Sequence, residues 1–270
     1  MALVKTSQLI EEQGFALAVN VILLEQAEAF LSASLALDVG LVLQLSENTV
    51  DYHGSLAPLG AALLAMARES KQNIAVHLDH ATRPDLVRSA AELGFSSVMY
   101  DGSNLEFAAN VATTKALREE LAGRVWFEAE LGEVGGKNGV HSPGVKTDPK
   151  AAAEFVLETG VDGLAVAVGS SHAMLEKSTE LDFAQIQLLA DAVSVPLVLH
   201  GSSGVSHENL KHAINAGIKK INIATELNMV FGASIKKNLD LGPADPRKFL
   251  VLARTDLAAH LINLYKAIAP

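Results

Sequence analysis

The sequence is organised around the stretch Asn73-Ile74-Ala75-Val76-His77-Leu78-Asp79-His80-Ala81, an apolar run that ends in a carboxylate beside an imidazole. A short run of Ile, Ala, Val and Leu is typical of a buried strand, so ionisable groups at its carboxyl end lie where the core meets solvent. Thr82 can cap a helix whose first turn holds Pro84 and Asp85. The stretch therefore predicts a strand that leads directly into a helix, with a functional site at the junction.

Seven similar runs lie elsewhere in the 270-residue chain, at residues 15–21, 40–45, 96–100, 125–129, 163–168, 196–199 and 220–223. Between them, apolar residues recur every three to four positions, which predicts helices at 25–37, 56–67, 105–121, 151–157 and 183–192. Eight strands that alternate with helices at this length favour an α/β fold, the closed (β/α)8 TIM barrel, as a single domain over residues 1–270 with a helical extension at about 246–270. An open doubly wound sheet is the alternative, although no G-x-G-x-x-G motif opens a helix.

Polar side chains stand at or just past the carboxyl end of nearly every predicted strand. They are Asn20, Gln44 with Ser46, Asp79 with His80, Asp101, Glu130, His172, His200, and Asn222 with Thr225. In a barrel these positions converge on one face, where enzymes of this fold carry their chemistry. The pattern therefore predicts an active site at that face.

Three of these residues, His80, His172 and His200, predict a metal site. Three neutral imidazoles with one open coordination position form a common catalytic zinc site. A single His at a strand end is as often a hydrogen-bonded core residue, but three at converging strand ends favour the metal. His77 precedes its strand end, so we interpret it as structural or as a support for a ligand.

Asp79 adjoins His80, and adjacent side chains on a strand start on opposite faces unless the backbone bends. Asp79 could instead cap the following helix, but Thr82 already offers a cap. We therefore predict that Asp79 acts as a general acid/base beside the metal, a role that typically accelerates a reaction by about 10² to 10⁴.

Two turns predict an anion site. The segments His200-Gly201-Ser202-Ser203-Gly204 and Asn222-Ile223-Ala224-Thr225 each join a strand to the amino terminus of a helix, which begins at Ser206 and at Glu226. Such turns present backbone N–H groups and hydroxyls to an anion, and the loops after strands seven and eight are the usual phosphate site of this barrel. A glycine-rich segment at 128–139 predicts a mobile lid over the mouth, with an ordinary surface loop as the alternative.

Composition narrows the class of protein. The net charge of −10 would repel a phosphate backbone, and no basic patch is interleaved with aromatics, so nucleic acid is not an expected partner. The chain has no cysteine, which excludes disulfides, thiolate metal sites and a Cys nucleophile. No apolar run reaches the roughly 20 residues of a membrane span, and the amino terminus lacks the apolar core of a signal peptide. We therefore expect a cytoplasmic protein with no membrane partner.

Taken together, these residues resemble the class II, metal-dependent ketose-bisphosphate aldolases, the family of the fructose- and tagatose-bisphosphate aldolases. The matching motifs span nearly the whole chain. They are His77-Leu78-Asp79-His80, Asp101-Gly102-Ser103, Glu128-Ala129-Glu130-Leu131-Gly132, Thr159-Gly160-Val161-Asp162 with Leu164-Ala165-Val166-Ala167, Leu199-His200-Gly201-Ser202-Ser203-Gly204, Asn222-Ile223-Ala224-Thr225-Glu226, and Asp245-Pro246-Arg247-Lys248. Their order, spacing and composition agree with the barrel and the metal site predicted above.

The resemblance implies roles for the residues at the mouth. Asp79 would be the acid/base at the substrate hydroxyl, and His80, His172 and His200 would hold Zn²⁺ or, as the alternative, another divalent metal. A monovalent cation is an optional additional cofactor. The metal would polarise the ketose carbonyl and stabilise the enediolate left when the C3–C4 bond breaks. The phosphate end of the dihydroxyacetone part would be held by Ala173, Gly201, Ser202, Ser203, Asn222, Ile223, Ala224 and Thr225, while Asn20, Asp101, Glu130 and Asn138 would support the site or belong to its loop.

A Schiff-base mechanism would instead need a lysine at the mouth. Lys219 and Lys220 begin the last predicted strand, so we expect them to point to the far end of the barrel. We therefore favour the metal-dependent mechanism.

Three departures from the family's pattern bear on the substrate. Ala173 replaces a Gly after the second metal-binding His, and its methyl would hinder close approach of the backbone to a phosphate. Asn138, in a shortened loop, replaces a Glu that handles the carbon-bound proton, so either Glu133 or His141 substitutes for it or this step differs. Leu23 stands where a second Asn is usual. A ketose other than fructose or tagatose bisphosphate, such as a monophosphorylated or sulfonated one, is therefore an open alternative.

Our first prediction is a zinc-dependent aldolase for a small-molecule sugar, which releases dihydroxyacetone or its phosphate and an aldehyde. A metal-dependent sugar isomerase or epimerase could use the same metal without breaking a carbon bond, and it would release no aldehyde. The non-enzyme alternative is a regulatory or stabilising subunit that kept the barrel but lost its loop base, and the retention of Asp79 and the three His argues against it. The resemblance implies a homodimer or homotetramer.

Overall fold

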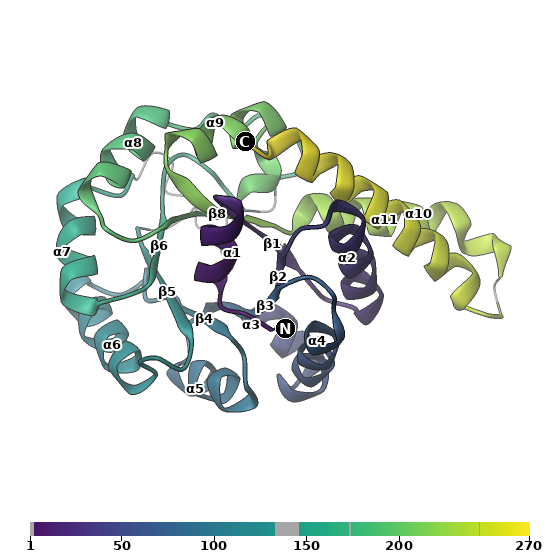
Figure 1. Cartoon of the computed structure of the whole chain (residues 1–270), viewed down its shortest axis with the longest axis horizontal. Coiled ribbons are helices and arrows are strands. Elements are labelled where there is room, and N and C mark those ends of the chain that lie inside the picture. The colour runs from purple at the N-terminus through teal and green to yellow at the C-terminus, as the bar shows by residue number, and fades with distance from the viewer. Residues whose placement is uncertain (1–2, 133–145, 173, 243) are drawn as a thin grey trace.

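The computed structural model describes residues 3–132, 146–172, 174–242 and 244–270. Its parallel strands form a closed barrel in which each strand pairs with its neighbours in chain order, from β1 round to β8 and back (Figure 1). The strands are β1 (Ala16–Asn20), β2 (Leu41–Ser46), β3 (Ile74–Ala81), β4 (Ser97–Tyr100), β5 (Trp126–Leu131), β6 (Gly163–Val166), β7 (Leu197–Leu199) and β8 (Ile218–Ile223). The predicted (β/α)8 barrel is confirmed, and the open sheet is excluded.

Helices surround the barrel on its outside (Figure 1). They are α2 (Leu24–Leu37), α4 (Ala57–Glu69), α5 (Pro84–Leu93), α6 (Phe107–Glu120), α7 (Pro149–Thr159), α8 (Phe183–Ala192), α9 (His207–Ala216), α10 (Thr225–Asn238) and α11 (Arg247–Ile268). All five helices predicted from apolar spacing are present, with ends within about two residues of those expected. Two short helices, α1 (Thr6–Gln13) and α3 (Glu47–His53), lie where the sequence predicts none.

The junction after β3 differs from the prediction. The N-cap of α5 is Arg83, while the backbone N–H and the hydroxyl of Thr82 donate to Glu47 at 2.6 and 3.2 Å. Arg83 Nε also lies 3.0 Å from Glu47 Oε1. Because Pro84 occupies the first turn of α5, fewer backbone N–H groups need a cap there. The predicted cap at Thr82 is therefore wrong, and the junction is held by α3.

Strand residues alternate between two layers, because successive side chains of a strand point to opposite faces. Inside the barrel, the apolar groups are Ala16, Ala18, Val42 and Ala75 in one cluster and Met99, Trp126, Ala165 and Val198 in another. On β8, Ile221 and Ile223 pack among the helices, whereas Lys220 and Asn222 share the inner face. Lys220 is fully buried inside the barrel, so the expectation that it points to the far end is wrong.

Helix α1 covers the end of the barrel where the strands begin (Figure 1). Its Leu9 is fully buried against the inner cluster that contains Ala16 and Ala75. A Cβ built on Gly40 would lie only 2.4 Å from Leu9 Cδ2, so Leu9 fills this space closely. Thr6 Oγ1 donates to Ser97 Oγ at 3.0 Å and ties the helix to β4.

We expect Leu9→Ala to lower the free energy of unfolding by about 2–5 kcal/mol, because it removes buried methyl groups and leaves a cavity that the barrel floor cannot close. Chemical denaturation followed by circular dichroism measures the change. Glu11→Ala, on the exposed side of the same helix, is the control and should change it by less than about 0.5 kcal/mol. An equal loss in both variants would contradict a specific role for Leu9.

The helices α10 and α11 project beyond the ring of the barrel (Figure 1). Helix α11 returns along α10 and packs on α2, and its Tyr265 stacks on Phe15 with ring centroids 5.4 Å apart. In the described part of the chain, no helix is both long and apolar enough to cross a membrane.

Candidate metal centre and substrate cavity

Asp79 and His80 both reach the mouth of the barrel because the backbone bends at the end of β3. His80 has a φ of 51°, in the left-handed region that residues with a side chain rarely adopt. The register of β3 against β4 also shifts between Leu78 and Ala81. Such an irregularity re-aims a side chain, so the bend that the adjacent pair requires is present.

The imidazoles of His80, His172 and His200 meet at this mouth. Each offers a ligand atom, and these atoms all lie within 4.8 Å of one another. The ring centroid of His80 lies 4.9 Å from that of His172 and 4.3 Å from that of His200. The fold therefore gathers the three predicted ligands around a space that one ion can share.

Hydrogen bonds orient two of the rings. His80 Nδ1 lies 3.0 Å from Asp101 Oδ2, and His200 Nε2 lies 2.9 Å from Glu128 Oε1. Since a carboxylate accepts, each ring carries its proton on that nitrogen and presents a lone pair on the other. The two remaining nitrogens, His80 Nε2 and His200 Nδ1, are 2.7 Å apart. With the nitrogen offered by His172, they form three imidazole donors around one space, and this donor set fits a divalent metal.

Two carboxylates lie behind His80. Asp101 and Glu130 are buried, and their oxygens come within 4.8 Å of a nitrogen of His80 and of each other. Asp101 also accepts from the backbone N–H and the hydroxyl of Ser103, at 3.1 and 2.6 Å. Carboxylates in this position orient a metal-binding imidazole and increase its basicity, which agrees with the supporting role predicted for both.

Asp79 is held between two amide side chains. Asn222 Nδ2 donates to its Oδ1 at 3.0 Å, and Gln44 Nε2 donates to its Oδ2 at 3.3 Å. Asp79 does not cap α5, whose N-cap is Arg83. Its carboxylate is therefore fixed in the mouth beside the imidazoles, where the acid/base role predicted for it would be exercised.

A cavity of about 310 Å³ opens at this face of the barrel. Most of the predicted site residues line it, namely Asn20, Gln44, Ser46, Asp79, His80, His172, Gly201, Ser202, Ser203, Asn222, Ala224 and Thr225. Asn48 and Thr49 of α3, which were not predicted from the sequence, also line it. The side chain of Ile223 packs among the helices instead. Ala173, Asn138 and the predicted lid beyond residue 132 lie outside the described residues.

The turns after β7 and β8 meet at the rim of the cavity. Ser202 Oγ donates to the carbonyl oxygen of Asn222, and the N–H of Glu226 donates to Ser203 Oγ at 3.2 Å. Gly201 has a φ of 65°, and a Cβ there would lie 2.6 Å from the backbone of Ser171, so this turn requires glycine. The rim combines hydroxyls with the amino terminus of α10, which favours an anion.

A pair of buried charges that was not predicted from the sequence lies beneath the mouth. Lys220 Nζ lies 2.8 Å from Glu128 Oε2, and both side chains are fully buried. Burial would raise the pKa of Glu128, but the Lys220 ammonium and the hydrogen bond from His200 outweigh it and hold that pKa well below its usual range. The available signal was the alternation of strand side chains: Lys220 lies two residues before Asn222 and must share its face.

His77 belongs to the same buried layer. Its Nδ1 lies 2.7 Å from Ser97 Oγ, and its Nε2 lies 3.8 Å from Glu128 Oε2. Burial and the nearby Lys220 lower the pKa of His77 well below its usual range, so the ring is neutral. Its position agrees with the interpretation of His77 as a structural or supporting residue.

Glu226, at the start of α10, connects three elements around the rim. Its carboxylate lies 3.0 Å from Lys177 Nζ, 3.1 Å from His207 Nε2 and 2.9 Å from His260 Nε2. Burial would raise the pKa of Glu226, but the hydrogen bonds from His260, Lys177 and His207 outweigh it and lower the pKa to about 2. This carboxylate therefore joins the segment after β6 to α9, α10 and α11.

We expect Glu226→Gln to be less stable than the unchanged chain at neutral pH, with a difference that closes as the pH falls. Because the pKa of Glu226 is lower in the folded chain than its ordinary value of 4.5, its stabilisation is complete above that value and is lost as the pH approaches 2. Thermal unfolding between pH 6 and pH 3 measures the difference. Glu208→Gln, on the exposed side of α9, is the control. If the difference in melting temperature between Glu226→Gln and the unchanged chain does not vary with pH, the stabilising role of the ionised Glu226 is contradicted.

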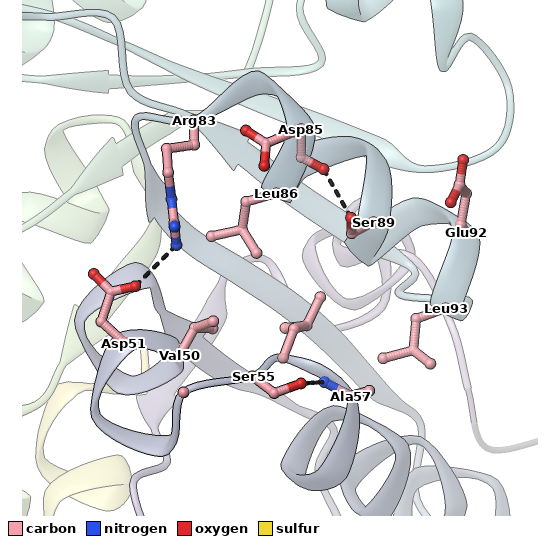
Figure 2. A pocket seen from close by; sticks show the side chains of 12 residues that line it. Val50, Asp51, Ser55, Ala57, Arg83, Asp85, Leu86, Ser89, Glu92 and Leu93 are labelled. Atoms are coloured by element: carbon pink, nitrogen blue, oxygen red, sulfur yellow. Dashed lines mark hydrogen bonds and ion pairs between the residues drawn. The ribbon is translucent and has the colours of Figure 1, made fainter.

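A larger cavity, of about 670 Å³, lies outside the barrel between α3, α4 and α5 (Figure 2). Its polar groups bond to one another: Arg83 Nη2 donates to Asp51 Oδ1 at 2.9 Å, and the N–H of Ala57 donates to Ser55 Oγ at 3.3 Å. None of the residues predicted for the active site lines it. The described residues that are predicted to form the active site therefore gather at the smaller cavity.

Comparison with known proteins agrees with this geometry. The family described as fructose-bisphosphate aldolase class-II matches residues 3–269. The YdjI aldolase from Escherichia coli K12 has 28% sequence identity and a TM-score of 0.87, over 98% of this chain and 97% of that chain. A putative fructose-1,6-biphosphate aldolase from Coccidioides immitis has 27% identity and a TM-score of 0.86, over 97% and 94% of the two chains. The fructose-bisphosphate aldolase from Campylobacter jejuni, at 20% identity and a TM-score of 0.78 over 99% and 95%, shares the fold. The match over nearly the whole chain shows that this protein belongs to the class II fructose-bisphosphate aldolase family.

Proposed function

We propose that this protein is a zinc-dependent aldolase that cleaves the C3–C4 bond of a ketose to dihydroxyacetone, or its phosphate, and an aldehyde. One observation carries the proposal: the Asp79 carboxylate and the imidazoles of His80 and His172 line the same cavity, with His200 directly behind them. A base beside a metal site is what a retro-aldol cleavage needs, because a hydroxyl must lose its proton while the ketose carbonyl gains negative charge.

Asp79 would take the proton from the C4 hydroxyl as the C3–C4 bond breaks, and the bonding electrons would pass to the ketose carbonyl. The Lewis acid that polarises this carbonyl would be Zn²⁺ held by His80, His172 and His200. In the reverse direction Asp79 would return the proton to the new hydroxyl. Asn222 and Gln44 keep the carboxylate in place for both directions. We propose Glu133 or His141, in the loop outside the described residues, as the group that protonates C3.

The cavity has features suited to a sugar with one anionic end. Asn20 Oδ1 and Gln44 Oε1 are buried and have no hydrogen-bond partner within the described residues. An unmet buried acceptor costs about 1–3 kcal/mol, so both would accept from substrate hydroxyls. The described residues that line the cavity include no Lys or Arg, so the anion would be held by the hydroxyls and N–H groups of the turns that contain Ser203 and Thr225. These features support a monophosphorylated or sulfonated ketose as well as a bisphosphate.

A product assay on metal-loaded protein tests the proposal. Fructose 1,6-bisphosphate, tagatose 1,6-bisphosphate, fructose 1-phosphate and an unphosphorylated sulfonated ketose are offered in parallel, with and without a chelator. Chelator-sensitive release of an aldehyde from any of them supports a metal-dependent aldolase, and the best substrate identifies the anionic group. An isomeric ketose or aldose without carbon bond cleavage would indicate an isomerase or epimerase. No conversion of any substrate would reject the proposal.

We also propose that the bound metal is Zn²⁺, that the protein is cytoplasmic, and that it forms a homodimer or homotetramer. Metal analysis of the purified protein distinguishes Zn²⁺ from another divalent ion. Light scattering coupled to gel filtration measures the oligomeric state.

A further inference from the structure

A buried lysine connects two separate parts of the proposed active site. Lys220 is completely buried inside the barrel, and its ammonium group lies 2.8 Å from both Glu128 Oε2 and Asn222 Oδ1. Taking an ammonium group out of water is costly unless opposite charge and hydrogen bonds compensate for it. An unbranched apolar side chain would fill a similar volume without that cost, so packing alone does not account for a lysine at this position.

The first connection runs through Glu128 to a metal-site imidazole. Glu128 Oε1 accepts from His200 Nε2 at 2.9 Å, which leaves the lone pair of His200 on Nδ1, the nitrogen that faces His80. The other oxygen of Glu128 is held by Lys220 Nζ at 2.8 Å, so Oε1 stays directed at His200 Nε2. A carboxylate that accepts from one ring nitrogen holds the His200 ring in one tautomer.

The second connection runs through Asn222 to the proposed base. An amide side chain has an acceptor end and a donor end, and it can be turned by half a rotation to exchange them. Lys220 donates to Oδ1 of Asn222, so Nδ2 faces Asp79 Oδ1 at 3.0 Å. The reversed amide would set its NH₂ group against an ammonium and its oxygen against a carboxylate. The lysine therefore selects the orientation in which Asn222 holds Asp79.

We propose that Lys220 is a positioning residue that fixes His200 in its metal-binding tautomer through Glu128 and fixes Asn222 in the orientation that holds Asp79. The inference rests on the proposed function, which makes His200 a metal ligand and Asp79 the base. Lys220 does not line the cavity and acts only through these neighbours. It should therefore affect metal affinity and turnover more than the apparent affinity for the ketose.

The test compares Lys220→Met with Lys219→Met, its neighbour on β8 that is not fully buried. Zinc affinity is measured by competition with a chromogenic chelator, and kcat and KM are measured on the best ketose. Lys220→Met should bind zinc about 10- to 100-fold more weakly, the range found when a residue that orients a ligand is lost. Its kcat should fall by a similar factor of about 10 to 100, because the base is displaced. The KM should change by less than about threefold, and Lys219→Met should match the unchanged chain in all three quantities.

Equal zinc affinity and equal kcat in Lys220→Met and Lys219→Met would overturn the inference. If Lys220→Met does not fold, the double variant Glu128→Gln with Lys220→Met removes both charges at nearly constant volume and is measured instead. Its zinc affinity should also fall, because a Gln amide can turn its NH₂ group toward His200 and lose the preference for one tautomer. Full zinc affinity and turnover in the double variant would equally overturn the inference.

The zinc measurement separates this inference from the proposed function. If the unchanged chain cleaves no ketose, while zinc binding weakens in Lys220→Met and not in Lys219→Met, aldolase activity is rejected and the connection to His200 is supported. If the unchanged chain cleaves a ketose and Lys220→Met equals it in zinc affinity and kcat, the inference alone is rejected.

Discussion

Replacing Asp79 by asparagine should lower kcat by about 10² to 10⁴, the usual contribution of a general acid/base, while the metal stays bound. The substitution removes the ability to take a proton and keeps the size of the side chain. It also keeps an acceptor oxygen that can receive the hydrogen bond from Asn222 or from Gln44. Asp79 is the one carboxylate among the described residues that line the cavity. No other side chain of that kind in the described lining can therefore take the proton in its place. The loss should therefore appear in kcat more than in KM.

Steady-state kinetics on the best ketose, together with metal analysis of the same preparation, measure this effect. Asp51→Asn is the matched control, because it makes the same chemical change on α3 outside the active-site cavity, where Asp51 forms an exposed ion pair with Arg83. The control should retain activity within about twofold, since such pairs contribute little to stability. A fully active Asp79→Asn variant would reject the acid/base role. A variant that loses both metal and activity would instead make Asp79 necessary for the metal site.

The barrel could be predicted because strands of a closed parallel barrel are buried on both faces and read as continuous apolar runs, as in Ile74-Ala75-Val76 of β3. Helix α1 could not be predicted in this way, because Leu9 is the one fully buried residue among its apolar residues. The helix is stabilised by packing against the barrel floor and not by an apolar pattern of its own. The same holds for α3, which is seven residues long. Its first turn is held by Ser46 Oγ, which accepts from the N–H of Thr49 at 3.2 Å.

The residues of the site could be predicted from their positions at strand ends, but their contacts could not. Whether Asp79 and His80 share a face depends on the left-handed backbone of His80, which no residue type in this stretch signals. The contacts of Glu128 with His200 and Lys220 join β5 to the end of β7 and to β8, so they depend on the closure of the barrel. The error at Lys220 arose from its place at the start of a strand, whereas the alternation of side chains decides which way it points.

Replacing His172 by alanine should weaken zinc binding by more than about 100-fold, since loss of a ligand exceeds the 10- to 100-fold effect of losing a residue that only orients one. Ketose cleavage should be lost with the metal. The ring of His172 lies 4.9 Å from that of His80 and 6.0 Å from that of His200, between centroids, so its removal leaves two of the three nitrogens. Two imidazoles do not complete a zinc site.

Thermal unfolding with increasing zinc tests this prediction without relying on activity, because a ligand that binds only the folded state raises the melting temperature according to its dissociation constant. Zinc should raise it for the unchanged chain and for His212→Ala, a control on the exposed side of α9, but not for His172→Ala at the same concentrations. An unchanged response in His172→Ala would remove this residue from the ligand set. The metal would then have to lie among His80, Asp101 and Glu130, the other group of close ligand atoms in the described chain. In that case Asp101→Asn should abolish the response that His172→Ala retains, because a neutral amide is a far weaker zinc ligand than a carboxylate.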